Sequence, residues 1–185
     1  MSDEKPEKKP IEEIQELLKV QEPKSFVFPP LERTRTSNLD DDLGILSSKS
    51  KARIYRSTAQ SIPDSTETKI QFNVENYDIN NEFDNVTNYR FTAKTNGYYL
   101  IVIQSGIQNA TADKIVLVYI YKNGVSYTAN QVTTNAISVP RIFLVDVIPL
   151  NIGDYIEGYI YHNFGSNQNS STGSTSNFLS IHKLS

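Results

Sequence analysis

From residue 52 onward the sequence is a succession of short strand-type segments, and this feature constrains the fold more than any other. The segments are rich in Ile, Val, Tyr and Phe, which favour extended backbone. Turn-rich links separate them, and the alternation of strands and helices that a parallel sheet requires is missing from this part of the sequence. The sequence therefore predicts an all-β fold, an antiparallel sandwich or jelly roll of about eight to ten strands. The expected strands are 52–57, 69–74, 89–93, 98–103, 115–121, 142–148, 155–161 and 178–184.

Three local patterns refine this prediction. Residues 69–74 alternate between polar and apolar side chains, which places Ile70, Phe72 and Val74 on one face of a strand. Residues 98–103 are continuously apolar, which predicts a strand covered on both faces. The pair Asn123-Gly124 favours a two-residue hairpin turn, because both of its positions require a positive φ. The aromatic residues expected in the core are Phe72, Phe91 and Phe143.

The first 51 residues have a different composition. They hold 9 of the 18 basic and 11 of the 21 acidic side chains but only two of the 19 aromatic ones, while all 11 tyrosines follow residue 51. A segment this charged cannot bury enough apolar surface to fold alone. The sequence thus predicts an extended N-terminal anchoring arm, 1–51, and a head domain, 52–185.

Two short apolar clusters lie in the arm. Pro10 suits the first position of a helix, the following apolar residues have helical spacing, and Pro23 ends the pattern. A helix of about ten residues is marginal alone in water, so its apolar side needs a partner surface. Residues 25–31 carry consecutive prolines and are typical of an extended peptide in a groove; a disordered, solvated tail is the alternative. The predicted particle-anchoring residues are Ile11, Ile14, Leu17, Leu18, Phe26 and Phe28.

Patterns typical of enzymes and metal sites are not present in the sequence. It has no Cys, no Gly-x-Ser-x-Gly motif and no phosphate-binding glycine loop. The two histidines, His162 and His182, are predicted at the surface or in an interface. We expect no enzymatic activity, no catalytic residue, no metal and no cofactor. The net charge of −3 argues against a nucleic-acid partner, and no apolar run is long enough for membrane insertion.

A purely polar stretch, 165–177, links the last two predicted strands. We interpret it as a mobile solvent loop; the alternative is a sugar-binding site that uses its amides and hydroxyls, with nearby tyrosines as a stacking platform. The candidate ligand-binding residues are Tyr159, Tyr161, Asn167 and Asn169.

Two stretches resemble a known family. The first contains Phe83-Asp84, then residues 89–93, then Gly97-Tyr98-Tyr99, and the second is Leu150–Ile156 with its Leu-x-x-Gly-Asp pattern. Together they resemble the signature of complement-type globular heads, which belong to the tumour-necrosis-factor-like jelly rolls. The resemblance covers roughly residues 54–184.

The sequence departs from the family pattern at two positions: Lys94 stands where the family has Pro, and Ile101 where it has Phe. The last predicted strand, 178–184, matches the family's terminal strand only loosely. No collagen-like repeat precedes the head, so the arm takes the place of the stalk found in animal members.

The resemblance implies a homotrimer packed by one sheet around a three-fold axis. The apolar strands also carry more apolar area than one sandwich interior can use, and an obligate trimer would bury the excess. The predicted trimer-interface residues are Tyr99, Tyr119, Tyr121 and Phe143.

Two functions are compatible with these patterns. In the first, the chain is a virion structural protein: a trimeric capsid decoration, fibre head or spike knob on the virion surface. Its arm binds a capsid or other virion protein, and its head contacts a host glycan or surface protein, or stabilises the shell. In the second, it is an adhesion module on a bacterial cell or spore surface. The charged N-terminus lacks the apolar core of a secretory signal, which favours the first expectation.

Overall fold

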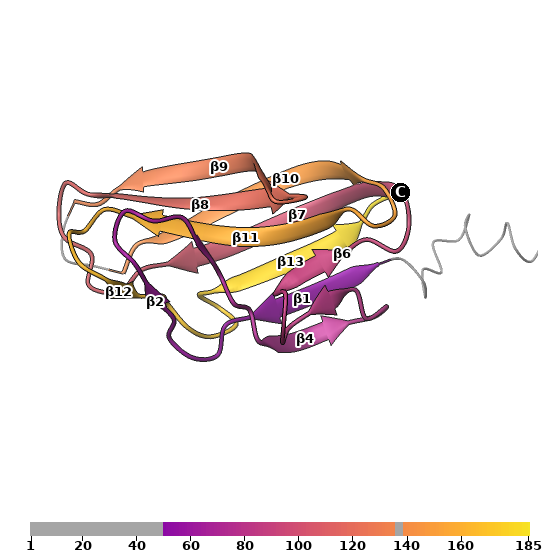
Figure 1. Ribbon diagram of the computed structural model, residues 1–185, viewed down its shortest axis with the longest axis horizontal. Coiled ribbons are helices and arrows are strands. Elements are labelled where there is room, and N and C mark those ends of the chain that lie inside the picture. Colours follow the sequence, from indigo (N-terminus) through magenta and orange to yellow (C-terminus); the bar gives the residue numbers. More distant parts are fainter. Residues whose placement is uncertain (1–49, 136–138) are drawn as a thin grey trace, which may run out of the picture. The chain divides into compact units, whose positions relative to one another are not determined.

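Two antiparallel sheets face each other in the computed structural model, which describes residues 50–135 and 139–185 (Figure 1). The first sheet has five strands in the order β10-β7-β13-β1-β4, and every neighbouring pair in it is antiparallel. Its strands are β1 (Lys51–Tyr55), β4 (Val74–Asp78), β7 (Gly97–Gly106), β10 (Arg141–Leu150) and β13 (Phe178–Lys183).

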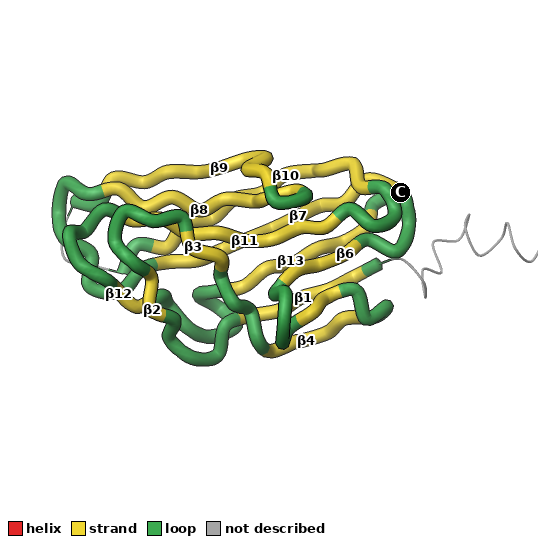
Figure 2. Tube along the Cα trace, viewed as in Figure 1, coloured by secondary structure: helices red, strands yellow, loops and turns green. Residues whose placement is uncertain are grey.

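The second sheet follows the order β5-β6-β11-β8-β9, and β3 also pairs with β11. Loops and strands alternate along the described chain without an intervening helix, so the predicted all-β sandwich is confirmed (Figure 2). The strands of this sheet are β3 (Thr68–Lys69), β5 (Phe83–Asp84), β6 (Arg90–Thr92), β8 (Ile115–Lys122), β9 (Val125–Thr133) and β11 (Tyr155–His162).

The sandwich has two distinct ends. Ser50 and Ser185 lie at one end, where β1 and β13 pair through Lys51 and His182 and the amide of Tyr98 donates to the Ser185 carbonyl at 3.2 Å (Figure 1). A small ribbon of β2 (Ser61–Ile62) and β12 (Gln168–Asn169) lies toward the other end. We call that second end the distal end.

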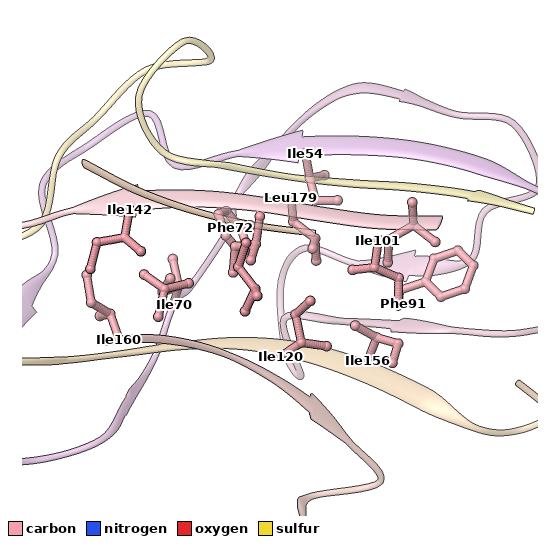
Figure 3. Packing of buried hydrophobic residues seen from close by; sticks show 14 of the residues in the cluster. Ile54, Ile70, Phe72, Phe91, Ile101, Ile120, Ile142, Ile156, Ile160 and Leu179 are labelled. Carbon is pink, nitrogen blue, oxygen red and sulfur yellow. The ribbon is translucent and has the colours of Figure 1, made fainter. Parts of the chain in front are cut away.

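Buried side chains fill the space between the two sheets (Figure 3). Alternate residues of β1, β7 and β13 in the first sheet and of β8 in the second are buried, so the core is built from both layers. Fully burying one such aliphatic or aromatic side chain stabilises the fold by roughly 1.5–3 kcal/mol. The fully buried residues labelled in Figure 3 include Ile54, Ile70, Phe72, Phe91, Ile101, Ile120, Ile156, Ile160 and Leu179.

The predicted strand 69–74 is wrong in its middle. The chain leaves the second sheet after β3 and enters the first sheet at Val74, so residues 70–73 cross between the layers. The Ile70 amide donates to the Gly158 carbonyl at 2.8 Å, and the Asn73 amide donates to the Tyr55 carbonyl at 3.1 Å. Ile70 and Phe72 are buried because they cross the core, whereas Val74 is only half-buried.

Two predictions about covered faces are also wrong. Residues 98–103 form part of β7, but only their odd-numbered side chains are buried in the core; Tyr98 is 56% exposed. Phe143, predicted in the core, lies on the opposite side of β10 from the buried Ile142 and is 52% exposed. Each of these strands is therefore apolar on both faces but covered on one.

The predicted Asn123-Gly124 turn is confirmed. Both residues have positive φ values, 53° and 77°, and they join β8 to β9. The Asp154 carboxylate accepts hydrogen bonds from the Asn151 amide at 2.9 Å and from the Asn123 side chain at 2.8 Å, and Lys122 lies 3.1 Å away. These contacts, the Asn151 amide first, lower the pKa of Asp154 to about 2. One side chain thus fixes two neighbouring turns.

The two stretches that resemble the complement-type family bond to each other. The Gly153 amide donates to the Ala93 carbonyl, and the Ala93 amide donates to the Asp154 carbonyl, both at 2.9 Å. The Gly-Asp turn therefore continues the pairing of β6 with β11. This explains physically why both patterns occur in one chain.

We expect Gly153→Val to destabilise the head by roughly 1–3 kcal/mol. Gly153 has a φ of +90°, which side chains disfavour, although a Cβ there would meet nothing within 4 Å. The cost therefore comes from the backbone alone and is measured by chemical denaturation. Gly153→Asn, which tolerates positive φ better, is the control and should lose less. Equal stability of the Val variant and the native chain would contradict this account.

Candidate functional site

The outer side of the first sheet carries a continuous exposed apolar surface. On β10, Phe143, Val145 and Val147 are 52%, 43% and 44% exposed, alternating with buried residues. They lie beside outward-facing residues of β7, because Val145 pairs with Val102 and Val147 pairs with Leu100. We call this surface the apolar face. It comprises Tyr98, Leu100, Val102, Phe143, Val145 and Val147.

Polar and charged residues border the apolar face on β13 and β1. His182 pairs with Leu100 across the β7–β13 ladder, and its Nε2 lies 2.8 Å from the Tyr77 hydroxyl. Burial, together with the charge of Lys51, lowers the pKa of His182. On the same sheet, the Arg53 guanidinium lies 4.4 Å from the ring centroid of Phe178. The apolar face therefore has a polar rim, which is the usual anatomy of a protein interface.

The edge beside β10 belongs to β9. Among the described residues β9 pairs only with β8, so one side of this nine-residue strand lacks a strand partner. Val125 and Tyr127 are exposed on it. The Asn130 side chain donates to the Phe143 carbonyl at 2.8 Å, which ties this edge to the strand that bears the apolar face.

A row of four tyrosines lies on the outer side of the second sheet. Tyr159 pairs with Tyr119 across β11 and β8. The rings of Tyr121 and Tyr159 stack with their centroids 4.0 Å apart, and the Tyr121 hydroxyl donates to Glu67. We call Tyr119, Tyr121, Tyr159 and Tyr161 the tyrosine row.

Burial raises the pKa of three tyrosines in the row, Tyr119, Tyr121 and Tyr159, above the usual value of a phenol. Burial, followed by the charge of Glu67, raises the pKa of Tyr119 to about 12, and burial likewise raises the pKa of Tyr121. The buried Glu157 forms an ion pair with Lys69 at 2.5 Å. Tyr119, Tyr121 and Tyr159 are therefore neutral at physiological pH and offer ring faces and hydroxyls rather than a nucleophile.

The four predicted trimer-interface residues are not brought together. Phe143 lies on the apolar face, but Tyr119 and Tyr121 belong to the tyrosine row on the other sheet. Tyr99 is fully buried, and its hydroxyl donates to the Thr95 carbonyl at 2.7 Å. The other residues of the apolar face, Tyr98, Leu100, Val102, Val145 and Val147, were not among the predicted ones, because the nearly continuous apolar sequence of β10 does not show which side is covered.

The four candidate ligand-binding residues lie in two places. Tyr159 and Tyr161 belong to the tyrosine row. Asn167 accepts a hydrogen bond from the Asp64 amide at 3.3 Å, and Asn169 belongs to β12 in the ribbon toward the distal end.

The expectation of a mobile solvent loop over 165–177 is contradicted. Ser170 and Asn177 are fully buried, and the Asn177 side chain donates to the Ser171 carbonyl at 2.7 Å. Residues 168–169 form β12, which pairs with β2. This segment folds onto the sandwich through its own polar contacts.

Of the two histidines, His162 differs from the prediction. It is fully buried: its Nε2 lies 3.0 Å from the Ile62 carbonyl and its Nδ1 accepts from the Phe164 amide at 3.3 Å. The ring therefore links β2 to the segment that follows β11. His182 is half-exposed on the rim of the apolar face.

Three predictions remain, which concern the anchoring residues of the arm, metal binding and membrane insertion. The anchoring residues Ile11, Ile14, Leu17, Leu18, Phe26 and Phe28 lie outside the described residues. Within the described residues, no three His, Asp or Glu side chains gather as a metal-binding group. The same residues contain no helix with the length and hydrophobicity to cross a bilayer.

Solved structures share the two-sheet arrangement. The globular domain of zebrafish complement 1qA protein superposes with a TM-score of 0.55 at 15% identity, covering 74% of this chain and 98% of that one. The fold is that of the TNF-like jelly rolls. Murine APRIL superposes with a TM-score of 0.57 at 15% identity, and the match covers 74% of this TNF-like chain and 100% of that one. Eiger TNF from S. frugiperda superposes with a TM-score of 0.55 at 11% identity, and the match covers 74% of this chain and 93% of that one.

The likeness at these identities concerns the fold. No protein-family model matches the sequence, and no curated protein matches it either. The resemblance found in the sequence motifs of the TNF-like head is thus confirmed by its three-dimensional arrangement.

Proposed function

We propose that this protein is a non-enzymatic structural head that forms a homotrimer through its apolar face. We further propose that it is displayed on a virion surface, anchored to a capsid or other virion protein by the arm, 1–51. The observation that carries the proposal is the apolar face itself, with three half-exposed apolar residues on β10 alone.

Burial of this face accounts for its composition. Outward-facing residues of antiparallel sheets are usually polar where water covers them. Here Val102, Val145, Leu100 and Val147 form two directly paired apolar couples across β7 and β10. Each such side chain contributes roughly 1.5–3 kcal/mol on full burial, which makes association of this face favourable.

A ring of three chains also requires two complementary surfaces on each chain, because its contacts are heterologous. The apolar face supplies one, and the neighbouring edge of β9, with Val125 and Tyr127, supplies a second of different shape. The TNF-like fold supports the same arrangement, because the family resemblance implies packing by one sheet around a three-fold axis.

The ends of the sandwich support a role for the arm as an anchor. The described chain starts at Ser50, near the end of the arm. Ser50 lies at the same end of the sandwich as Ser185, beside β13 (Figure 1). The opposite, distal end of the head is then free to face away from the particle. The virion assignment itself rests on the composition of the arm and its two apolar clusters.

Light scattering on the full chain tests the assembly, and we expect three times the mass of one chain at micromolar concentration. A monomer would contradict the homotrimer. Fractionation of infected cultures tests the location, and we expect the protein to sediment with particles. Recovery on a cell or spore surface, without particles, would instead favour the adhesion module.

A further inference from the structure

A polar cavity with a volume of about 280 Å³ lies in the surface of the head. It lies where β7 ends and β10 begins, beyond the last residues of the apolar face. Its volume is just below the range for drug-sized ligands, roughly 300–1,000 Å³, which suits one sugar ring. The polar residues lining it are Gln108, Asn109, Arg141, Ser171, Thr172 and Ser176.

The lining segments are held in place by β7. Gly106 pairs with Arg141 across the ladder, and its carbonyl accepts from the Ser171 amide at 2.8 Å. A Cβ on Gly106 would lie 2.2 Å from the Pro140 carbonyl oxygen and 3.0 Å from the Ser171 Oγ. The missing side chain therefore lets both flanking segments approach the strand closely, which fixes the cavity wall.

Two polar groups of the cavity lack protein partners among the described residues. The Ser171 side chain is only 4% exposed, yet its hydroxyl has no hydrogen-bond partner there. A buried hydroxyl without a partner is costly, so it points to a ligand. The exposed Arg141 guanidinium has no ion pair in the described part of the chain. Its planar fork of donors matches a carboxylate in a bidentate geometry.

The remaining lining residues indicate what carries that carboxylate. None of them is acidic, so a negative charge meets no repulsion from the wall. Asn109, Thr172 and Ser176 supply amide and hydroxyl groups, which pair with sugar hydroxyls. Val139 adds an apolar contact of the kind that a sugar ring needs for its non-polar face.

We propose that this cavity binds a carboxylated sugar, a sialic or uronic acid, with Arg141 binding the carboxylate and Ser171 a ring hydroxyl. The site is complete within one chain, and its Arg141 lies two residues before Phe143, the residue of the apolar face nearest to it on β10. It therefore goes beyond the proposed assembly and does not depend on it.

Calorimetric titration of the full-length chain tests the proposal. The probes are N-acetylneuraminic acid, glucuronic acid, neutral glucose and sulfate. We expect at least one of the two acids to bind and glucose to bind at least tenfold more weakly. Arg141→Gln should weaken binding of that acid at least tenfold, and Ser171→Ala several-fold. Arg90→Gln removes the same charge from β6 and should leave binding unchanged.

Three outcomes would overturn the proposal. Neither acid binds; or an acid binds equally well after Arg141→Gln; or sulfate binds as tightly as the acids, which would make the cavity a bare anion site. Light scattering and circular dichroism on each variant show whether assembly and folding are intact. Because these readouts are separate, loss of sugar binding in an intact trimer and loss of the trimer itself are distinguishable.

Discussion

Replacing Val145 with Asp is expected to leave the head folded but monomeric. Val145 lies in the middle of β10, 43% exposed and directly opposite Val102 on the apolar face. In the trimer the new aspartate would be a buried carboxylate without a partner. This lowers the stability of each interface between neighbouring chains by about 3–5 kcal/mol. Since about 1.4 kcal/mol is a tenfold change in affinity, each contact weakens by more than a hundredfold.

The same substitution is mild within one chain. The exposed side of β10 does not contact the core, and strand preferences at such positions differ by only about 1 kcal/mol. Light scattering at micromolar concentration should therefore show one chain per particle, with a circular dichroism spectrum like that of the native protein.

Val86→Asp is the matched control. Val86 is 74% exposed in the turn between β5 and β6 of the second sheet, away from the apolar face. Its carboxylate stays in water, so stability should change by no more than about 0.5 kcal/mol and the trimer should persist. A trimeric Val145→Asp variant, or a monomeric Val86→Asp variant, would show that the assembly uses another surface.

The fold was predictable because its signals are local. Strand-type composition, the Asn123-Gly124 turn and the Gly153-Asp154 turn each act within a few residues, and the structure confirms them. The family resemblance adds the jelly-roll arrangement, whereas the order of the strands within each sheet was not predicted.

The location of the apolar face was not predictable in the same way. On β7, Tyr98 and Tyr99 are neighbours of one type, and only the partner sheet determines which of them is buried. The error at residues 70–73 has a similar origin, because a segment that crosses the core is apolar at alternate positions without belonging to one strand. β9 was missed as a strand because most of its residues are exposed on both sides, so no burial pattern marks it.

Deleting residues 1–45 is expected to leave the head's melting temperature nearly unchanged and to abolish its incorporation into particles. The buried apolar cluster of the described residues is drawn entirely from positions 52 to 181, so the head closes its core with its own side chains. Keeping residues 46–50 preserves the hydrogen bond from the Ser50 hydroxyl to Glu82 at 2.9 Å and the start of β1 at Lys51.

The composition of the arm explains both halves of this expectation. Of the arm's 51 residues 20 are charged, and most of its apolar side chains lie in two clusters, 11–20 and 26–31, with four more between 39 and 46. Chains that contribute to a core spread such residues along their length, whereas segments that fold on binding gather them into contact sites. Three arms on one trimer would bind together, so contacts that are weak singly gain strongly from multivalency.

Replacing Ile14 and Leu17 together with Asp separates a specific apolar contact from general attraction by charge. These residues lie on one side of the predicted helix, and the change removes its apolar stripe. Incorporation into particles, measured on sedimented particles, should fall strongly. The control Lys19→Asp changes the net charge by the same two units on the polar side of the predicted helix and should incorporate normally. If the truncated head unfolds, the arm is part of the fold; if truncated or Ile14/Leu17-substituted chains still enter particles, attachment occurs through the head and the anchoring role fails.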